Sequence, residues 1–177
     1  ARLCVTVVFF GGKVVRSAYH VEQVASFGNA CGTIACTHAL TNAELNGGVV
    51  GEGAALTKFR NATENGTSRE RGSALVADKL FHNLSDEAAT DQSAQTTCPD
   101  RGDTYLGHHY CCLVPIRGDG DAEARIIELD GTKVSPVDHG PVGNRDFLEA
   151  AAEVVKERWL KLEPERIDFV LMALSKN

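Results

Sequence analysis

An α+β fold is predicted for this chain of 177 residues, because apolar runs of strand length and helical segments both occur along it. Runs that are typical of β-strands lie at residues 3–10, 106–114, 126–131 and 167–174. Segments with helical patterns lie at residues 30–41, 54–60, 69–81 and 145–162. We expect a single domain over residues 1–177, large enough to bury about 70% of the surface that its unfolded chain exposes.

The first strand and the two helices in the middle of the chain follow from local patterns. The run Leu3–Phe10 is interpreted as a buried strand, since it is far short of the ~20 residues that a membrane-spanning helix needs. An Asn-Gly turn separates the helices at 54–60 and 69–81. In the second of these helices, Val76 and Leu80 are one helical turn apart and are the expected core pair.

A polar stretch, a helix and a strand make up the rest of the chain. Residues 85–107 are polar and contain few branched apolar residues, which is typical of a surface loop. Asn144 is the expected N-cap of the last helix, whose apolar residues fall on one face. The strand at 167–174 is strongly apolar, and we expect Met172 to lie in the core.

Composition excludes several classes of protein. The net charge of −6 argues against general nucleic-acid binding, for which a basic face is expected. No apolar run is long enough to place the protein in a membrane. Six cysteines in a chain of this size do not make a disulfide scaffold. The alternative is a zinc site, whose ligands would be Cys98, His108, His109 and Cys111. No Cys-x-x-Cys pair supports such a site. We therefore expect neither a metal nor a cofactor.

Cys31 is the most informative single residue. It follows Asn29, a good helix N-cap, and precedes a run that is typical of a buried helix. A thiol at that place meets unpaired backbone N–H groups and the positive end of the helix dipole, which favour the thiolate. The alternative is a small buried cysteine that only packs under the Gly32 turn.

Downstream residues favour the nucleophile. His109 lies near the start of the strand at 106–114, and Asp130 lies near the end of the strand at 126–131. A cysteine, a histidine that takes its proton and a carboxylate that orients the imidazole are the components of a thiol protease. These residue types alone are a weak indication, because the chemistry does not fix their spacing in sequence.

The segments around these three residues resemble the ubiquitin C-terminal hydrolases, thiol proteases that release small adducts from the C-terminus of ubiquitin. The matching segments occur in the family's order over nearly the whole chain, at residues 29–34 with 38–39, 109–114, 128–131, 138–140 and 167–175. The resemblance implies an α+β papain-like fold with a central antiparallel sheet flanked by helices. It also implies a cytoplasmic deubiquitinating enzyme that works without a cofactor and has ubiquitin as its partner.

The resemblance assigns a role to each matching residue. Cys31 matches the nucleophile, His109 the general base and acid, and Asp130 the orienting carboxylate. Because neighbouring strand residues point to opposite faces, His108 is expected to face away from Cys31. His109 and Asp130 are expected within hydrogen-bond reach of each other, about 2.6–3.2 Å between heavy atoms.

Gln23 is the candidate for the oxyanion-hole residue, which the family places upstream of the cysteine. It lies eight positions before Cys31, further than the family's usual spacing, and Ala25 occupies the expected position. Either residues 24–28 loop out and Gln23 still reaches the site, or the donor is lost. The donor is worth roughly 3–4 kcal/mol of transition-state stabilisation.

Two further expectations follow from the resemblance. The polar stretch 85–107 stands where the family has a crossover loop over its active site, which limits the size of the substrate; a passive linker is the alternative. Relative to the family, the chain is expected to lack the usual N-terminal segment. Two other functions stay open: a catalytically weak ubiquitin-binding protein, and a hydrolase of another ubiquitin-like modifier.

Overall fold

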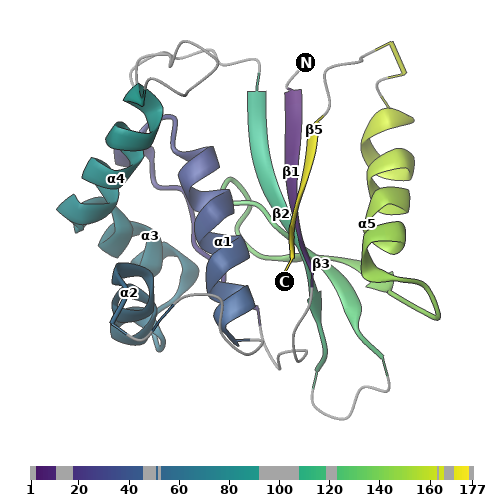
Figure 1. Ribbon diagram of the computed structural model, residues 1–177, viewed down its shortest axis with the longest axis horizontal. Coiled ribbons are helices and arrows are strands. Elements are labelled where there is room, and N and C mark those ends of the chain that lie inside the picture. Colours follow the sequence, from purple (N-terminus) through teal and green to yellow (C-terminus); the bar gives the residue numbers. More distant parts are fainter. Residues whose placement is uncertain are drawn as a thin grey trace.

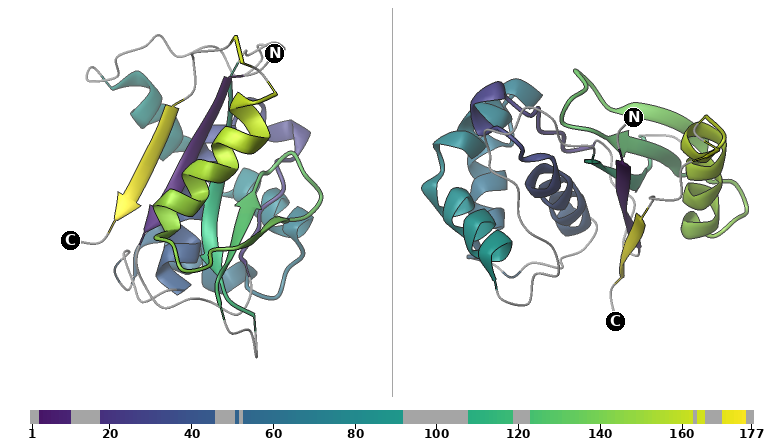
Figure 2. Two further views of the ribbon diagram at one scale, coloured as in Figure 1. Left: turned by 90° about the vertical axis from the view of Figure 1, so that its right-hand side faces the viewer. Right: turned by 90° about the horizontal axis from the view of Figure 1, so that it is seen from above.

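A five-stranded sheet with helices on both faces forms the framework of the protein. The computed structural model describes residues 3–10, 18–45, 51, 53–91, 108–118, 123–162, 164–165 and 170–175, and it describes the backbone alone for residues 3–10, 44–45, 89, 108 and 175. One face of the sheet is covered by α1 and then by α2 to α4, and the other by α5 (Figures 1 and 2). The helices are α1 (Cys31–Leu45), α2 (Ala55–Thr63), α3 (Ser68–Ala77), α4 (Lys79–Thr90) and α5 (Phe147–Val155). Among the described residues, no helix has the length and apolar character that a membrane span requires.

The sheet is mixed, with the strands in the order β4-β3-β2-β1-β5. Its strands are β1 (Leu3–Phe10), β2 (His108–Ile116), β3 (Arg125–Leu129), β4 (Val137–Pro141) and β5 (Val170–Ser175). The expected antiparallel pairing is found between β2, β3 and β4. Strand β1, which lies between β2 and β5, instead runs parallel to both of them. Parallel pairing is available to β1 because long helical connections separate it from both partners in sequence.

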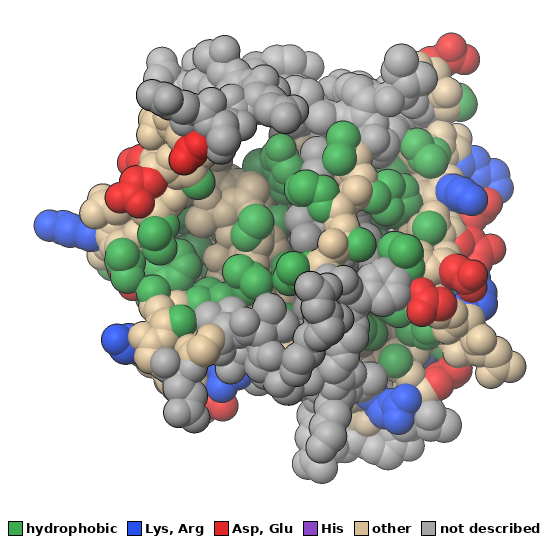
Figure 3. All heavy atoms as spheres, in the orientation of Figure 1, with side chains coloured by type: hydrophobic (Ala, Val, Ile, Leu, Met, Phe, Trp, Pro, Cys, Tyr) green, Lys and Arg blue, Asp and Glu red, His purple; other side chains and the backbone are tan. Residues whose placement is uncertain are grey.

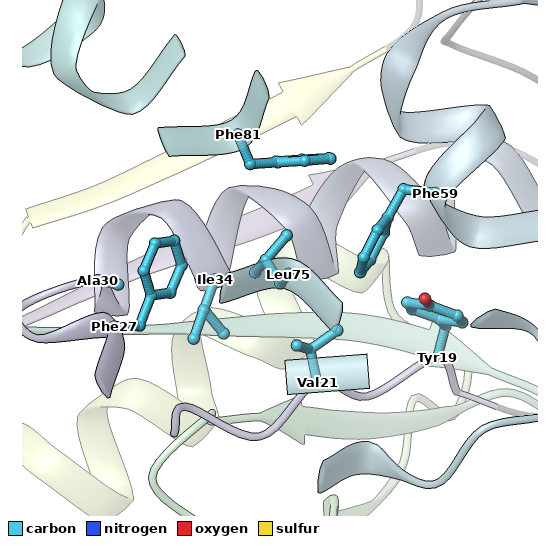
Figure 4. Packing of buried hydrophobic residues seen from close by; sticks show 8 residues of the cluster. All are labelled: Tyr19, Val21, Phe27, Ala30, Ile34, Phe59, Leu75 and Phe81. Carbon is cyan, nitrogen blue, oxygen red and sulfur yellow. The ribbon is translucent and has the colours of Figure 1, made fainter. Parts of the chain in front are cut away.

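Strand β2 is buried on both faces and joins the two halves of the core. Cys112 and Val114 pack against Ala39 and Ala43 of α1. Leu113, which points to the opposite face, packs with residues of α5. A third cluster joins α1 to the outer helices, as Figure 4 shows; it comprises Tyr19, Val21, Phe27, Ala30, Ile34, Phe59, Leu75 and Phe81. The helix that begins at Cys31 is therefore held between the sheet and a layer of helices.

The predicted helix at 69–81 is wrong in its extent, because the helix is interrupted at Asp78 and a second helix begins after it. Asp78 has an extended conformation with ψ of 101°, and its carboxylate caps α4 by accepting the Leu80 N–H. The break changes which side chains face the core, so Leu75 is fully buried and Leu80 is 47% exposed. Val76 is partly buried against the same cluster as Leu75, whereas Leu80 is exposed, so the expected core pair is wrong at Leu80.

Helix α4 also includes the first residues of the predicted surface loop. It continues to Thr90, so residues 85–90 are helical and the predicted start of the loop at Ser85 is wrong. The carboxylate of Asp78 at the N-cap explains this, because the cap starts a new helix where the sequence pattern indicated the end of the previous one. Residues 92–107, the rest of the predicted loop, lie outside the described part of the chain.

Two expectations about the C-terminal elements need correction. Helix α5 begins at Phe147 with Asp146 as its N-cap, which accepts the Leu148 N–H, so the cap is not Asn144. Strand β5 is an edge strand, and for this reason Met172 is 47% exposed instead of buried. Hydrophobic side chains gather over this part of the surface (Figure 3).

Gly72 should be essential for stability, because α3 approaches the backbone of the segment before α1 very closely. A Cβ atom at Gly72 would lie 2.0 Å from the carbonyl oxygen of Glu22. Overpacking of this kind typically costs about 1–3 kcal/mol, so we expect Gly72→Ala to lower the free energy of unfolding by that amount in urea denaturation. Gly51→Ala is the control, since its added methyl group meets nothing within 4 Å. Equal stability of the two variants would contradict the close packing of α3.

Candidate active site

The first residue of α1 is Cys31, which confirms that the thiol lies at a helix N-terminus. The N-cap position falls on Ala30, whose carbonyl oxygen accepts the Ile34 N–H at 2.9 Å, and not on the expected Asn29. Cys31 is partly exposed. The unpaired N–H groups of the first helical turn and the helix dipole both favour a negative charge on its sulfur.

His109, the second residue of β2, joins the thiol to a carboxylate. Its Nε2 atom lies 2.9 Å from Oδ1 of Asp130, within the range expected from the sequence. Its side chain is also hydrogen-bonded to Cys31. Because Nε2 binds Asp130, Nδ1 is the ring nitrogen that is available to the thiol. The structure therefore brings Cys31, His109 and Asp130 together in one hydrogen-bonded row. The side chain of His108 lies outside the described part of the chain.

Asp130 follows β3 directly and is held by its own turn. Its Oδ1 atom accepts the backbone N–H of Thr132 at 2.9 Å and the Thr132 hydroxyl at 2.8 Å. Burial alone would raise the pKa of Asp130, but the His109 hydrogen bond and those from Thr132 lower it to about 2. Asp130 is therefore ionised at neutral pH. Sequence reasoning missed Thr132, although an Asp followed two residues later by a backbone donor is a known turn pattern.

The electrostatics of the row favour separated charges on the thiol and the imidazole. Hydrogen bonds to Asp130 and then to Cys31 raise the pKa of His109 to about 10, against the effect of burial. Burial alone would raise the pKa of Cys31, but hydrogen bonds with His109 and with the backbone of Tyr110 and Gly32 lower it. A low thiol pKa beside a high imidazole pKa gives a thiolate–imidazolium pair, which is the reactive form of a cysteine nucleophile.

Gln23 lies close to the start of α1, and the extra residues after it form a 3₁₀ turn. That turn, Ala25–Phe27, takes up three of the positions between Gln23 and Cys31. The Gln23 Nε2 atom donates to the carbonyl oxygen of Gly28 at 2.7 Å, so the amide reaches toward the N-terminus of α1. The backbone N–H of Gln23 donates to the Gly131 carbonyl at 2.7 Å, which ties this segment to the turn that carries Asp130.

Besides Cys31, the cysteines whose side chains the structure describes are Cys36, Cys111 and Cys112. Cys111 and Cys112 are buried, whereas Cys36 is exposed although it lies inside α1. Of the four ligands of the alternative zinc site, Cys98 and the side chain of His108 lie outside the described residues. Among the residues that are described, no group of His, Cys, Asp or Glu side chains is placed to hold a metal ion.

A second buried carboxylate lies two residues before Asp130. Glu128 is 3% exposed and binds the side chain of Lys133 and, at 2.8 Å, the Nε2 atom of His139. Hydrogen bonds to these two partners lower the pKa of Glu128 against the opposing effect of burial. This cluster joins β3, the turn after it and β4, and it was not predicted from the sequence because nothing local relates its three residues.

The fold and the hydrogen-bonded row define a papain-like arrangement of cysteine, histidine and aspartate, and comparison with known proteins gives the family. Residues 12–160 match the family described as ubiquitin carboxyl-terminal hydrolase, family 1, and the chain belongs to this family. A ubiquitin carboxyl-terminal hydrolase of Drosophila melanogaster is 33% identical over 150 residues, which is 83% of this chain and 59% of the relative. One from Aplysia californica is 36% identical over 151 residues, which is 84% of this chain and 64% of the relative.

Solved structures show the same fold. The crystal structure of Trichinella spiralis UCH37 bound to ubiquitin vinyl methyl ester has a TM-score of 0.59 at 24% identity, covering 83% of this chain and 52% of that one. The α+β papain-like fold of the family is thereby shown for this chain. The chain spans 59% and 64% of the length of the two curated relatives above.

Proposed function

We propose that the protein is a cysteine-type deubiquitinating hydrolase in which residues 1–177 act as one catalytic domain. It would cleave small adducts or short peptides from the C-terminal glycine of ubiquitin. The observation that carries the proposal is the row of Cys31, His109 and Asp130, with His109 Nε2 at 2.9 Å from Asp130 Oδ1. Membership of the family supports the reaction and the substrate.

The geometry supports a two-step mechanism. The Cys31 thiolate attacks the carbonyl carbon of the C-terminal glycine, and the His109 imidazolium gives its proton to the leaving amine as the C–N bond breaks. Water then attacks the thioester, His109 takes a proton from this water, and the C–S bond breaks to release the carboxylate and regenerate the thiolate. Asp130 holds the imidazole throughout. Gln23 is our candidate donor to the oxyanion, supported by its place beside the N-terminus of α1.

Ubiquitin is the partner that the comparisons favour. The relatives carry the name ubiquitin carboxyl-terminal hydrolase, and the related Trichinella spiralis structure holds a ubiquitin vinyl methyl ester. The net charge of −6 is compatible with the basic C-terminal tail of ubiquitin. A cytoplasmic location is part of the proposal and agrees with the free thiols of the described cysteines.

A ubiquitin with a C-terminal vinyl methyl ester tests the proposal directly. We expect it to become covalently attached to Cys31, as shown by peptide mass spectrometry. Cys36→Ser is the matched control, because its thiol is exposed on the same helix, and it should react like the wild type. Attachment only of a ubiquitin-like analogue would mean a different modifier. Binding of ubiquitin without attachment would mean a non-catalytic binding protein.

A size limit on the leaving group is the second part of the proposal. Ser85 of α4 lies 2.9 Å from Thr33 in the first turn of α1, between their hydroxyl oxygens, and β2 carries His109. The two elements that flank residues 92–107 therefore each carry a residue close to the row: Ser85 of α4 beside the first turn of α1, and His109 of β2. This supports a crossover loop, which a folded adduct cannot pass.

The size limit predicts which substrates are cleaved. Ubiquitin with a short peptide or a small ester at its C-terminus should be hydrolysed quickly, and folded di-ubiquitin slowly, in steady-state assays. Insertion of a Gly-Ser segment between residues 92 and 107 should increase di-ubiquitin cleavage and leave the small substrates unchanged. The same insertion in the β2–β3 connection is the control and should change neither rate. Efficient di-ubiquitin cleavage by the unmodified protein would contradict the size limit.

A further inference from the structure

His20 is a buried histidine that contacts the backbone of Asp130. It is 1% exposed. Its neighbours Tyr19 and Val21 both point into the hydrophobic cluster under α2 to α4 (Figure 4). His20, between them, instead directs its Nε2 atom to the carbonyl oxygen of Asp130 at 3.0 Å and its Nδ1 atom to the Ser68 hydroxyl at 3.0 Å.

The two partners determine where the ring carries its proton. A carbonyl oxygen can only accept, so the Nε2 atom of His20 must hold a hydrogen and donate it to Asp130. In the neutral ring the Nδ1 atom then accepts the hydroxyl hydrogen of Ser68. Burial lowers the pKa of His20, which agrees with a neutral ring. The charged groups that act on its pKa are the Asp130 carboxylate, Arg71, which donates to the His20 backbone carbonyl at 3.2 Å, and Glu22.

The helix that carries Cys31 fixes the segment to which His20 belongs. His38, seven residues after Cys31, stacks on the His20 ring with 5.1 Å between centroids and 17° between planes. The Nε2 atom of His38 accepts the Val21 N–H at 2.9 Å. Asn42, one turn further along α1, accepts the Tyr19 N–H at 2.8 Å. The position of the His20 ring is therefore set by α1.

The hydrogen bond from His20 reaches Asp130 from outside its turn, whereas those from Thr132 and Lys133 come from within it. Thr132 donates to the carboxylate, and Lys133 donates its backbone N–H to the Asp130 carbonyl at 3.0 Å. Both donors belong to the turn and would move with it. The His20 bond comes from a separate segment anchored on α1, and this segment also donates the Gln23 N–H to the Gly131 carbonyl at 2.7 Å. The two bonds can together fix the turn relative to the thiol, and the one from His20 acts on Asp130 itself.

We propose that His20 is a positioning residue, whose Nε2–H holds the Asp130 peptide so that the carboxylate stays directed at His109. The proposal rests on the proposed function, in which Asp130 orients His109. If the His20 bond is lost, the turn moves and the carboxylate holds the imidazolium less well. The pKa of His109 then falls, its attraction for the thiolate weakens, and the pKa of Cys31 rises.

Two substitutions of His20 test the roles of its two ring nitrogens separately. The amide nitrogen of Gln can take the place of Nε2, so His20→Gln keeps a donor for the Asp130 carbonyl. The amide of Asn can take the place of Nδ1, so His20→Asn keeps only the contact with Ser68. The readout is the rate of Cys31 alkylation by iodoacetamide against pH, followed by peptide mass spectrometry, together with kcat and KM for a ubiquitin C-terminal ester.

His20→Asn should move the alkylation midpoint of Cys31 upward by roughly 0.5–1 pH unit, the equivalent of one hydrogen bond. It should lower kcat by about five- to tenfold with KM unchanged. His20→Gln should restore most of both values. Equal shifts in the two variants, or no shift in either, would overturn the proposal. If the wild type does not hydrolyse the ester but the alkylation profiles still differ as stated, the proposed function fails and the positioning role stands.

The unaltered protein provides a second measurement in case a variant does not fold. In ¹⁵N NMR spectra of the histidine side chains, His20 should show a protonated Nε2 and a bare Nδ1 at neutral pH. The Nδ1–H form would overturn the proposal, since Nε2 could not then donate to Asp130. Ser68→Ala, a change outside the site, should leave this form in place.

Discussion

Replacement of Cys31 by serine is expected to abolish hydrolysis of ubiquitin C-terminal esters and amides. The hydroxyl that replaces the thiol does not ionise beside His109, so the attacking group is lost. Removal of a nucleophile from a triad costs on the order of 10⁶-fold in kcat. Ubiquitin binding should remain, because the change is one atom in size. Steady-state hydrolysis and calorimetric titration with ubiquitin would measure the two quantities.

Cys36→Ser is the matched control for this experiment. Cys36 lies on the same helix and is exposed, but it is not in the hydrogen-bonded row. Its replacement should leave hydrolysis within about twofold of the wild type, as is usual for a surface substitution. Substantial activity in Cys31→Ser, or a loss of activity in a folded Cys36→Ser, would show that the nucleophile has been assigned wrongly.

His109→Ala should produce the second large effect. It removes both the general acid and base and the positive partner of the thiolate, so turnover should fall by about 10²–10⁴-fold or more. The pKa of Cys31 should rise because its first stabilising hydrogen bond is lost. The thiolate fraction at pH 6 therefore decreases, and iodoacetamide should alkylate Cys31 more slowly at that pH than in the wild type.

His108→Ala tests the choice between the adjacent histidines. The Nε2 atom of His109 is already bound to Asp130, and neighbouring side chains on a strand point to opposite faces. His108→Ala should therefore keep turnover and the alkylation profile close to those of the wild type. A larger loss in His108→Ala than in His109→Ala would refute the assignment of His109.

The parts of the site that could be predicted from the sequence are those with a local signal. Cys31 follows residues that favour a helix start, and the apolar runs of β2 and β3 indicated where His109 and Asp130 would lie. The limits of Leu3–Phe10 were correct because an apolar run that follows Arg2 and ends at the Gly11-Gly12 pair leaves little freedom. The residues that support the row have no such signal: His20 and Asp130 are 110 positions apart.

The wrong predictions about the fold have two causes: a capping side chain that interrupts a helix, and the order of the strands. Asp78 ends one helix and caps the next, and the apolar pattern continues across it without a visible interruption. Met172 is apolar and in a strand, but the sequence does not contain the order of the strands, which puts β5 at the edge. Topology decides burial at such positions, and a single sequence does not show it.

The order of the strands also determines when the sheet can form during synthesis. β1 is made before the other four strands, yet Leu3 pairs with His108 and Val5 with Val170. Until those residues have been made, both edges of β1 carry backbone donors and acceptors that other chains can pair with. Non-local parallel pairing of this kind is slow, because a large loop must close before any contact is gained. β1 is therefore open to wrong association from its own synthesis until β2 and β5 have both been made.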